Sequence, residues 1–191
     1  MKKLVFFMAA LFMTLAAQAQ DGLKLGLKAG GNYASVTGDV TDAKYKFGFH
    51  AGGFLDYGIS DFVSIRPELL FSMKGYEAAT PLGDAEVSLN YLDLPILARI
   101  NADGLFFEGG PTLGYLLSSS MEIGGKSLDG DDDGMAKFEL GYAAGLGYQL
   151  PTGLGIGLRY QGGITSIFDD SDGKARNSVF QLSLSYTLGG R

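Results

Sequence analysis

The chain has 191 residues, a formal net charge of −6, one histidine and no cysteine. The acidic balance excludes nucleic acid as a partner, because no basic cluster is present to neutralise phosphates, and the absence of cysteine excludes disulfides and thiolate metal sites. The 30 glycines are about 16% of the chain, more than twice the usual share of about 7%. With 13 Phe and 10 Tyr, the chain is too aromatic for simple disorder.

The first 19 residues have the three parts of a secretory signal peptide. Lys2 and Lys3 form the basic start, residues 4–17 are apolar, and Ala17-Gln18-Ala19 is a cleavage site of the A-x-A type. This apolar run is too short for a stable transmembrane helix. We therefore expect cleavage after Ala19 and a single mature domain over residues 20–191. Removal of the two lysines changes its charge from −6 to −8.

From residue 23 onward, apolar and polar residues alternate with a period of two, which indicates β-strands. Leu25 and Leu27 share one face of the first segment, for example, whereas Lys24 and Lys28 lie on the other. Eight segments have this pattern, with apolar positions over residues 23–33, 45–57, 63–73, 87–100, 105–117, 138–148, 154–160 and 180–188.

The fourth segment departs from the regular alternation at one point. Val87, Leu89 and Tyr91 occupy odd positions, whereas the apolar residues from Leu92 to Ile100 occupy even ones. A shift of one residue is what a β-bulge produces. We therefore predict a bulge between Tyr91 and Leu92, with both apolar sets on the same outer face.

The linkers between the segments alternate in length. Short linkers cover residues 59–62, 101–104 and 150–153, and long ones cover 37–44, 76–85, 119–137 and 167–177. Short turns at one end and long loops at the other describe an antiparallel up-and-down meander. The long linkers contain 12 acidic and 5 basic residues, a net charge of −7.

The side on which the apolar face lies distinguishes two kinds of barrel. A soluble barrel such as a lipocalin turns its apolar residues inward, whereas an outer-membrane barrel turns them toward lipid. Here the aromatic residues of the apolar face gather at both ends of the segments, as expected for two membrane interfaces. That face carries no charged residue in our assignment. The sheet must also close into a barrel, because an open sheet edge in lipid would leave unpaired backbone groups.

We therefore predict an all-β fold, an eight-stranded antiparallel up-and-down transmembrane β-barrel. The signal peptide and the even strand number place it in the outer membrane of a Gram-negative bacterium. Both termini are expected in the periplasm and the long loops outside the cell.

The polar face of the segments carries charges of both signs. The basic residues are Lys24, Lys28, Lys46, Arg66, Lys74, Arg99 and Arg159, and the acidic ones are Asp56, Glu68, Glu86, Asp93, Glu108 and Glu139. An eight-stranded barrel is only wide enough for side chains to fill it, and unpaired buried charges are costly. We predict that these charges pair across the lumen and form a polar plug, with inward glycines (Gly141, Gly145, Gly155 and Gly157) making room for the long side chains.

His50 is the only residue that could act as the base of a Ser-His-Asp site. Its position in the alternation places it in the lumen, where a hydrogen-bonded structural role is the simpler interpretation. A barrel enzyme acting on lipid A would need His50 on the lipid side, beside a serine. We assign no catalytic residue.

Residues 129–134, Asp-Gly-Asp-Asp-Asp-Gly, match the opening of an EF-hand loop. Asp129, Asp131 and Asp133 would supply oxygen ligands for Ca²⁺. The twelfth position is Leu140, where an EF-hand has a bidentate Glu. We consider two hypotheses: the acidic loops are simply solvated, or they form a weak calcium site that bridges to lipopolysaccharide. No other cofactor is expected.

The segment Tyr91-Leu-Asp-Leu-Pro-Ile-Leu-Ala-Arg99 resembles a strand of the PorT-like outer-membrane β-barrel family of Bacteroidetes. Residues 26–34, 47–55 and 65–71 are similar to its first three strands, and the resemblance covers essentially the whole mature chain. It implies an eight-stranded barrel assembled by the BAM machinery, with no catalytic residues. Some members are linked to type IX secretion or gliding. Such barrels usually end in an aromatic residue, whereas this chain ends in Leu188-Gly-Gly-Arg191, so Tyr186 would take that role.

The preferred function is that of a small, monomeric, non-enzymatic outer-membrane barrel. It would have a structural or interaction role through its loops, in contact with membrane lipid and lipopolysaccharide; its protein partner is unknown. An accessory of protein secretion, a lipid-modifying enzyme and a narrow channel are the alternatives.

Overall fold

The computed structural model describes residues 22–38, 43–80, 83–123, 126–129, 134–168 and 174–188. The predicted signal peptide and its cleavage site lie outside these ranges. No helix in the described part of the chain is long and apolar enough to span a membrane.

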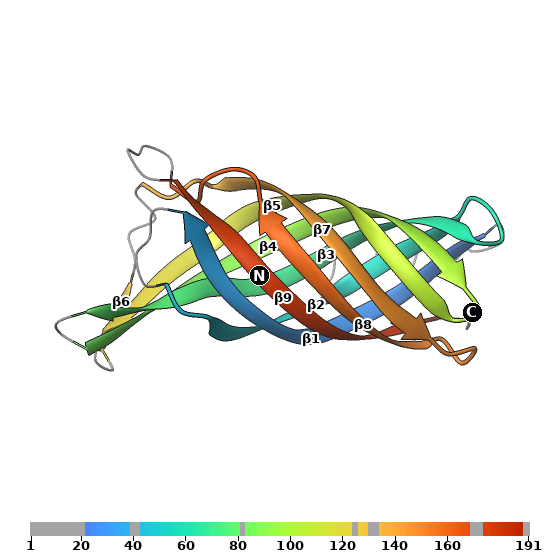
Figure 1. Cartoon of the computed structure of the whole chain (residues 1–191), viewed down its shortest axis with the longest axis horizontal. Coiled ribbons are helices and arrows are strands. Elements are labelled where there is room, and N and C mark those ends of the chain that lie inside the picture. The colour runs from blue at the N-terminus through green and yellow to red at the C-terminus, as the bar shows by residue number, and fades with distance from the viewer. Residues whose placement is uncertain are drawn as a thin grey trace, which may run out of the picture.

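The described residues form β-strands joined by turns and loops (Figure 1). The strands are β1 (Leu23–Gly38), β2 (Lys46–Gly58), β3 (Val63–Thr80), β4 (Gly83–Ala102), β5 (Leu105–Ile123), β6 (Lys126–Asp129), β7 (Phe138–Gln149), β8 (Leu154–Gly163) and β9 (Ala175–Thr187). Eight of them follow one another around a ring in the order β4-β3-β2-β1-β9-β8-β7-β5, and β5 pairs back with β4. All the ladders are antiparallel. The predicted eight-stranded antiparallel barrel is therefore confirmed.

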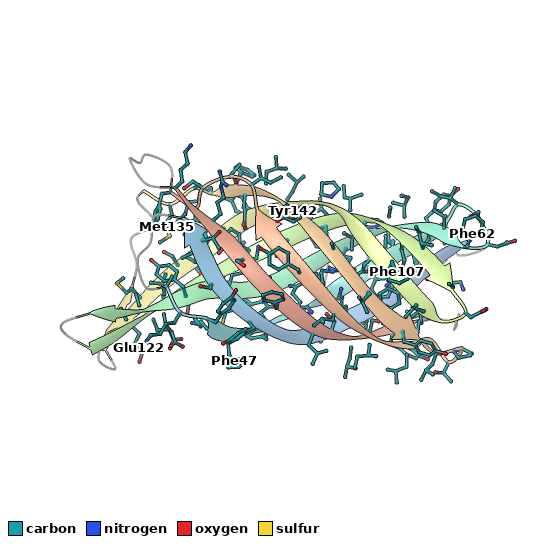
Figure 2. The ribbon with its side chains drawn as sticks, viewed as in Figure 1. Phe47, Phe62, Phe107, Glu122, Met135 and Tyr142 are labelled. Carbon is teal, nitrogen blue, oxygen red and sulfur yellow. The ribbon has the colours of Figure 1, made fainter. Side chains whose placement is uncertain are left out.

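The barrel is apolar outside and polar inside. Phe47 is 80% exposed and Leu184 is 59% exposed, whereas Glu68 and Arg159 are almost completely buried. Figure 2 shows Phe47, Tyr142 and Phe107 on the outer surface of the wall. This inverted distribution is the one expected when lipid surrounds the barrel.

Hairpin turns connect the strands at the short-linker end of the barrel. Between β4 and β5, Asp103 and Gly104 have φ angles of 47° and 95°. Positive φ at both central residues defines a type I′ turn, for which Asp-Gly is a preferred sequence, and its twist matches that of the flanking strands. The four-residue linkers at 59–62 and 150–153 make the other two turns.

The predicted bulge lies on a different strand from the one expected. In β4 the odd positions are buried from Ala85 to Arg99 without a change of parity. The pairing instead shifts on β5, where Tyr91 is opposite Leu116 and Asn90 is opposite Ser118, so Leu117 is the extra residue.

The prediction that Val87, Leu89 and Tyr91 face outward is therefore wrong. All three are buried inside the barrel, at most 3% exposed. The apolar pattern misled because β4 lines an apolar part of the lumen there. The alternate positions Glu86, Ser88 and Asn90 are polar. The alternation therefore looks like that of a lipid-facing segment, although its apolar side faces the lumen.

An apolar cluster fills the long-loop end of the lumen, and we call it the apolar cap. It consists of Val36, Val87, Leu89, Tyr91, Leu116, Ile167 and Ala175. Ile167, from the loop between β8 and β9, is held there because its backbone N–H donates to the Ala175 carbonyl and its carbonyl accepts from the Ala136 N–H. Met135 and Phe168 also pack against the cluster.

Two of the predicted long loops are in part strand. β3 continues to Thr80, β4 begins at Gly83 and β5 continues to Ile123, where β6 pairs with it. In Figure 1 these ends project beyond the rest of the barrel. They form a four-stranded extension in which β6 pairs only with β5 among the described strands.

We predict that Leu89→Ala lowers the free energy of unfolding by about 2–5 kcal/mol, because it leaves a cavity within the apolar cap. Leu94→Ala is the matched control on the outer face of the same strand, where Leu94 is 37% exposed. Surrounding lipid fills that gap, so its effect is expected to be about 1 kcal/mol or less. Urea unfolding of the refolded barrel measures both, and the opposite order would restore the outward orientation of this part of β4.

Candidate functional site: the barrel lumen

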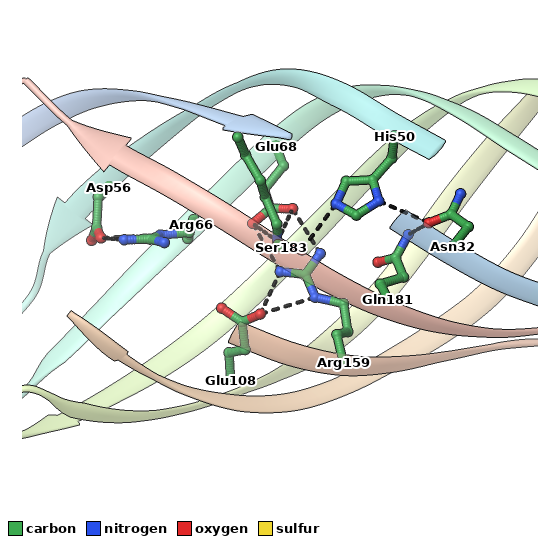
Figure 3. Close-up of polar contacts among 10 residues, drawn as sticks. Asn32, His50, Asp56, Arg66, Glu68, Glu108, Arg159, Gln181 and Ser183 are labelled. Carbon is green, nitrogen blue, oxygen red and sulfur yellow. Dashed lines mark hydrogen bonds and ion pairs between the residues drawn. The ribbon is translucent and has the colours of Figure 1, made fainter. Parts of the chain in front are cut away.

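The middle of the lumen is filled by two acids and two bases, which we call the central layer (Figure 3). The Arg159 guanidinium donates to both oxygens of Glu68, at 2.7 and 2.9 Å, and its Nε donates to Glu108 Oε1 at 2.9 Å. Lys28 Nζ lies 3.3 Å from both Glu68 oxygens. All four side chains are at most 7% exposed. Their formal charges cancel, which limits the cost of burying them.

A second ionic cluster lies on the long-loop side of the central layer. Lys74 Nζ donates to Asp93 Oδ1 and to Glu139 Oε2, at 3.0 Å each. The same ammonium group lies 4.5 Å from the centre of the Tyr91 ring. Gln161 Nε2 also donates to Asp93, at 3.3 Å. Tyr91 therefore joins the apolar cap to this cluster.

Two arginines on the short-turn side stack on aromatic rings. Arg66 pairs with Asp56 and lies 4.1 Å above the Phe54 ring. Arg99 lies 3.6 Å above the Phe106 ring and donates to Asn101 Oδ1 at 2.9 Å and Gln149 Oε1 at 2.7 Å. Among the described carboxylates, none lies within ion-pair distance of Arg99, so it differs from the pairing predicted for it.

Lys46 and Lys24 lie at opposite ends of the lumen. Lys46 is buried near the long-loop end, where its Nζ lies 2.5 Å from Glu86 Oε1 and also donates to Ser88. The Glu86 side chain is 48% exposed, which corrects its predicted place inside the lumen. Lys24 is half-buried and lines a polar cavity of about 230 Å³ at the short-turn end, together with Asp56 and Gln149.

Two inward aromatic residues, Phe54 and Phe106, were not predicted from the sequence. Both are at most 4% exposed. A Cβ atom at Gly26 would lie 2.1 Å from the Phe54 ring, and one at Gly147 would lie 2.3 Å from the Phe106 ring. Gly26 and Gly147 thus make room for rings. Of the four glycines predicted to make room for long charged side chains, only one lies against such a residue: Gly145 faces Arg159, whereas Gly157 faces Phe106, Gly141 faces Thr112 and Gly155 faces Ser185. The alternation could have predicted the two inward rings, because Phe54 and Phe106 occupy even positions, as the inward residues Asp56 and Glu108 do.

His50 is held in the lumen by polar side chains (Figure 3). Its Nδ1 lies 2.8 Å from Asn32 Oδ1 and its Nε2 lies 2.9 Å from Ser183 Oγ. Asn32 Nδ2 donates to the carbonyls of Phe49 and Met73, which orients the amide with Oδ1 toward the ring. Because an amide oxygen only accepts, His50 donates from Nδ1, and Nε2 accepts from the serine hydroxyl.

This connectivity is that of a Ser-His-Asn constellation, but its surroundings do not suit catalysis. Ser183 is 4% exposed, and the cavity beside it holds only about 10 Å³, room for about one water molecule. An ester substrate therefore has no space at this hydroxyl. The lipid-side position that a lipid-modifying enzyme would need is not the position of His50.

The described residues contain no group of three acids, cysteines or histidines arranged to hold a metal ion. The calcium hypothesis rests on Asp129, Asp131 and Asp133. Asp131 and Asp133 lie outside the described residues, and for Asp129 only the backbone, at the end of β6, is described.

A protein-family comparison agrees with the barrel geometry. Residues 16–169 match the model of the outer membrane protein beta-barrel domain. This chain belongs to that family. Membership of this family indicates that the barrel is located in the outer membrane. No curated protein matches the chain.

Two solved structures show the same fold at low sequence identity. Neisserial surface protein A has a TM-score of 0.58 and 15% identity, over 87% of this chain and 99% of its own. The attachment invasion locus protein Ail of Yersinia pestis has a TM-score of 0.53 and 18% identity, over 88% of this chain and 100% of its own. These likenesses show the fold alone.

We predict that Glu68→Gln lowers the free energy of unfolding by about 3–5 kcal/mol, because buried Lys28 then loses its carboxylate and Arg159 keeps only Glu108. Adding Lys28→Met should recover at least half of this loss, since Arg159 and Glu108 then balance. Chemical unfolding of the two single variants and the double variant gives the coupling energy. Purely additive losses would mean that the central layer does not act as a unit.

We predict that Ser183 does not react with a fluorophosphonate probe in the folded barrel, because no space beside its hydroxyl admits the reagent. In-gel fluorescence after labelling measures this, with a serine hydrolase as positive control. Labelling that disappears in Ser183→Ala would show an accessible nucleophile and reopen the enzymatic hypothesis.

Proposed function

We propose that this protein is a closed outer-membrane barrel with a structural or interaction role, and that it neither conducts solutes nor catalyses a reaction. The observation that carries this proposal is the central layer, in which Lys28, Glu68, Glu108 and Arg159 occupy the cross-section with balanced charge. A permeating ion would have to replace these contacts, each of which is made between buried groups.

The apolar cap supports the same conclusion independently. It places Leu89, Tyr91 and Ile167 across the long-loop end of the lumen, each at most 2% exposed. An ion that crosses such a region loses its water without gaining polar partners, which is costly. The lumen thus has two successive barriers of different chemistry.

The interaction role rests on what lies beyond the membrane. We propose that the termini are periplasmic and the long-loop end is outside the cell, after insertion by the BAM machinery as a monomer. The extension made by β3, β4, β5 and β6 then presents a sheet to the exterior. Glu77, Glu86 and Glu122 are opposite one another on its three successive longer strands. Such a row of like charges is unfavourable within a sheet. Lys46 offsets it at Glu86, and we propose that a cationic partner does so at Glu77 and Glu122.

We predict that the unmodified barrel gives no stable open state in planar lipid bilayers, because the central layer and the apolar cap block the lumen. Single-channel recording at neutral pH measures this, with a large porin as the positive control for insertion. A long-lived state of high conductance would contradict the proposal and favour the narrow channel.

A further inference from the structure

Gly31 lies in the middle of β1, and the alternation of the strand turns this position outward. A Cβ atom at the neighbouring inward Gly30 would lie 2.0 Å from the Leu182 carbonyl oxygen, so that position requires glycine. At Gly31 a Cβ atom would meet nothing within 4 Å, and its φ is not positive. Glycine inside a strand costs about 0.5–1 kcal/mol relative to alanine. No backbone or packing requirement explains this cost at Gly31.

The space above Gly31 is an apolar groove of about 290 Å³ on the outer wall. Its sides are formed by Tyr33, Phe47, Leu158, Phe180 and Leu182. A second apolar depression of about 400 Å³ lies next along β1, around Ala29 and Ala51. Small residues of β1 and β2 thus line two neighbouring depressions in the outer surface.

Aromatic rings close the long-loop end of this groove. Tyr33 stacks on Tyr45 at 4.5 Å, and Phe180 lies 6.2 Å from Tyr45 and 5.1 Å from Tyr160. Aromatic bands of membrane barrels lie where the hydrocarbon meets the headgroups. The groove is therefore on the hydrocarbon side of this boundary, in the leaflet nearer the long loops.

A basic residue, Arg176, lies on the same face, beyond the rings toward the long loops. The β1–β9 ladder pairs Gly31 with Leu182, and six residues further along β1 it pairs Thr37 with Arg176. This separation is about 20 Å along the strand. Arg176 is exposed, at the level expected for headgroups. A guanidinium group binds phosphate with two parallel hydrogen bonds.

We propose that this face of β1, β2 and β9 binds one lipid that has a phosphorylated headgroup, as lipid A has. One acyl chain lies in the groove over Gly31 and Ala29, and a phosphate contacts Arg176. The occupant is a membrane lipid because the groove opens into the hydrocarbon of the bilayer. The choice of leaflet rests on the orientation proposed above.

The groove is tested by native mass spectrometry of the refolded barrel with diphosphorylated lipid A. Gly31→Leu places a side chain in the groove, starting from a Cβ atom that meets nothing within 4 Å, so we expect the bound fraction to fall at least fivefold. Ala144→Leu is the matched control, since Ala144 is also exposed on the outer wall but on β7 and does not line the groove. It should bind like the unmodified protein.

The headgroup contact is tested with Arg176→Gln, which should weaken retention of diphosphorylated lipid A and leave that of dephosphorylated lipid A unchanged. Heat-modifiable mobility in gels verifies that each variant is folded. Absence of a retained lipid in the unmodified barrel, or equal retention by Gly31→Leu, would overturn the inference. Conductance is measured separately and should not change in Gly31→Leu, so this inference and the proposed function can fail independently.

Discussion

The structure depends on one constraint, that a chain crossing lipid must satisfy every backbone N–H and C=O group within itself. The antiparallel ladders do this by closing a ring in which β5 pairs back with β4. Closure with eight strands leaves an interior only as wide as its side chains. Every inward residue therefore has to fit against its neighbours, and the lumen becomes the core of the protein.

A core made of charged residues is stable only when its groups satisfy one another. Arg159 meets this condition with two carboxylates, and Lys74 does so with two more. Arg66 and Arg99 use ring faces in addition to polar partners, and those rings fit because Gly26 and Gly147 have no side chain. The high glycine content is thus partly explained by the volume of the lumen.

The two ends of the barrel differ in a way that follows from their linkers. Tight turns such as Asp103-Gly104 leave the short-turn end open to a polar cavity. At the other end the strands continue past the cap, and loop residues such as Ile167 return into the lumen. The blocked barrel and the sheet that extends from it are therefore separate parts of the molecule. The proposed interaction role depends only on the extended sheet. The wall itself has an uneven outer surface, and Gly31 marks the place where a lipid chain fits.

The sequence by itself determined the eight strands of the barrel wall and their environment, but not β6 or the extensions of β3, β4 and β5. The period of two and the apolar outer face follow directly from the geometry of a strand between lipid and a polar lumen. It also placed Glu68 and Arg159 on the inner face, because alternation assigns each residue to a side of the wall. A single chain pattern does not tell which residues meet across the lumen, since partners such as Arg159 and Glu68 are 91 positions apart.

Only the tertiary structure decided where the alternation fails and which inward residues meet. Tyr91 was assigned to the lipid face because alternation does not distinguish an apolar side that lines the cap from one that contacts lipid. The bulge that shifts the register lies on β5 at Leu117. The contacts of Arg99 with Phe106 and of His50 with Ser183 depend on closure. Closure brings distant strands together within a narrow lumen, and that proximity is a property of the whole ring.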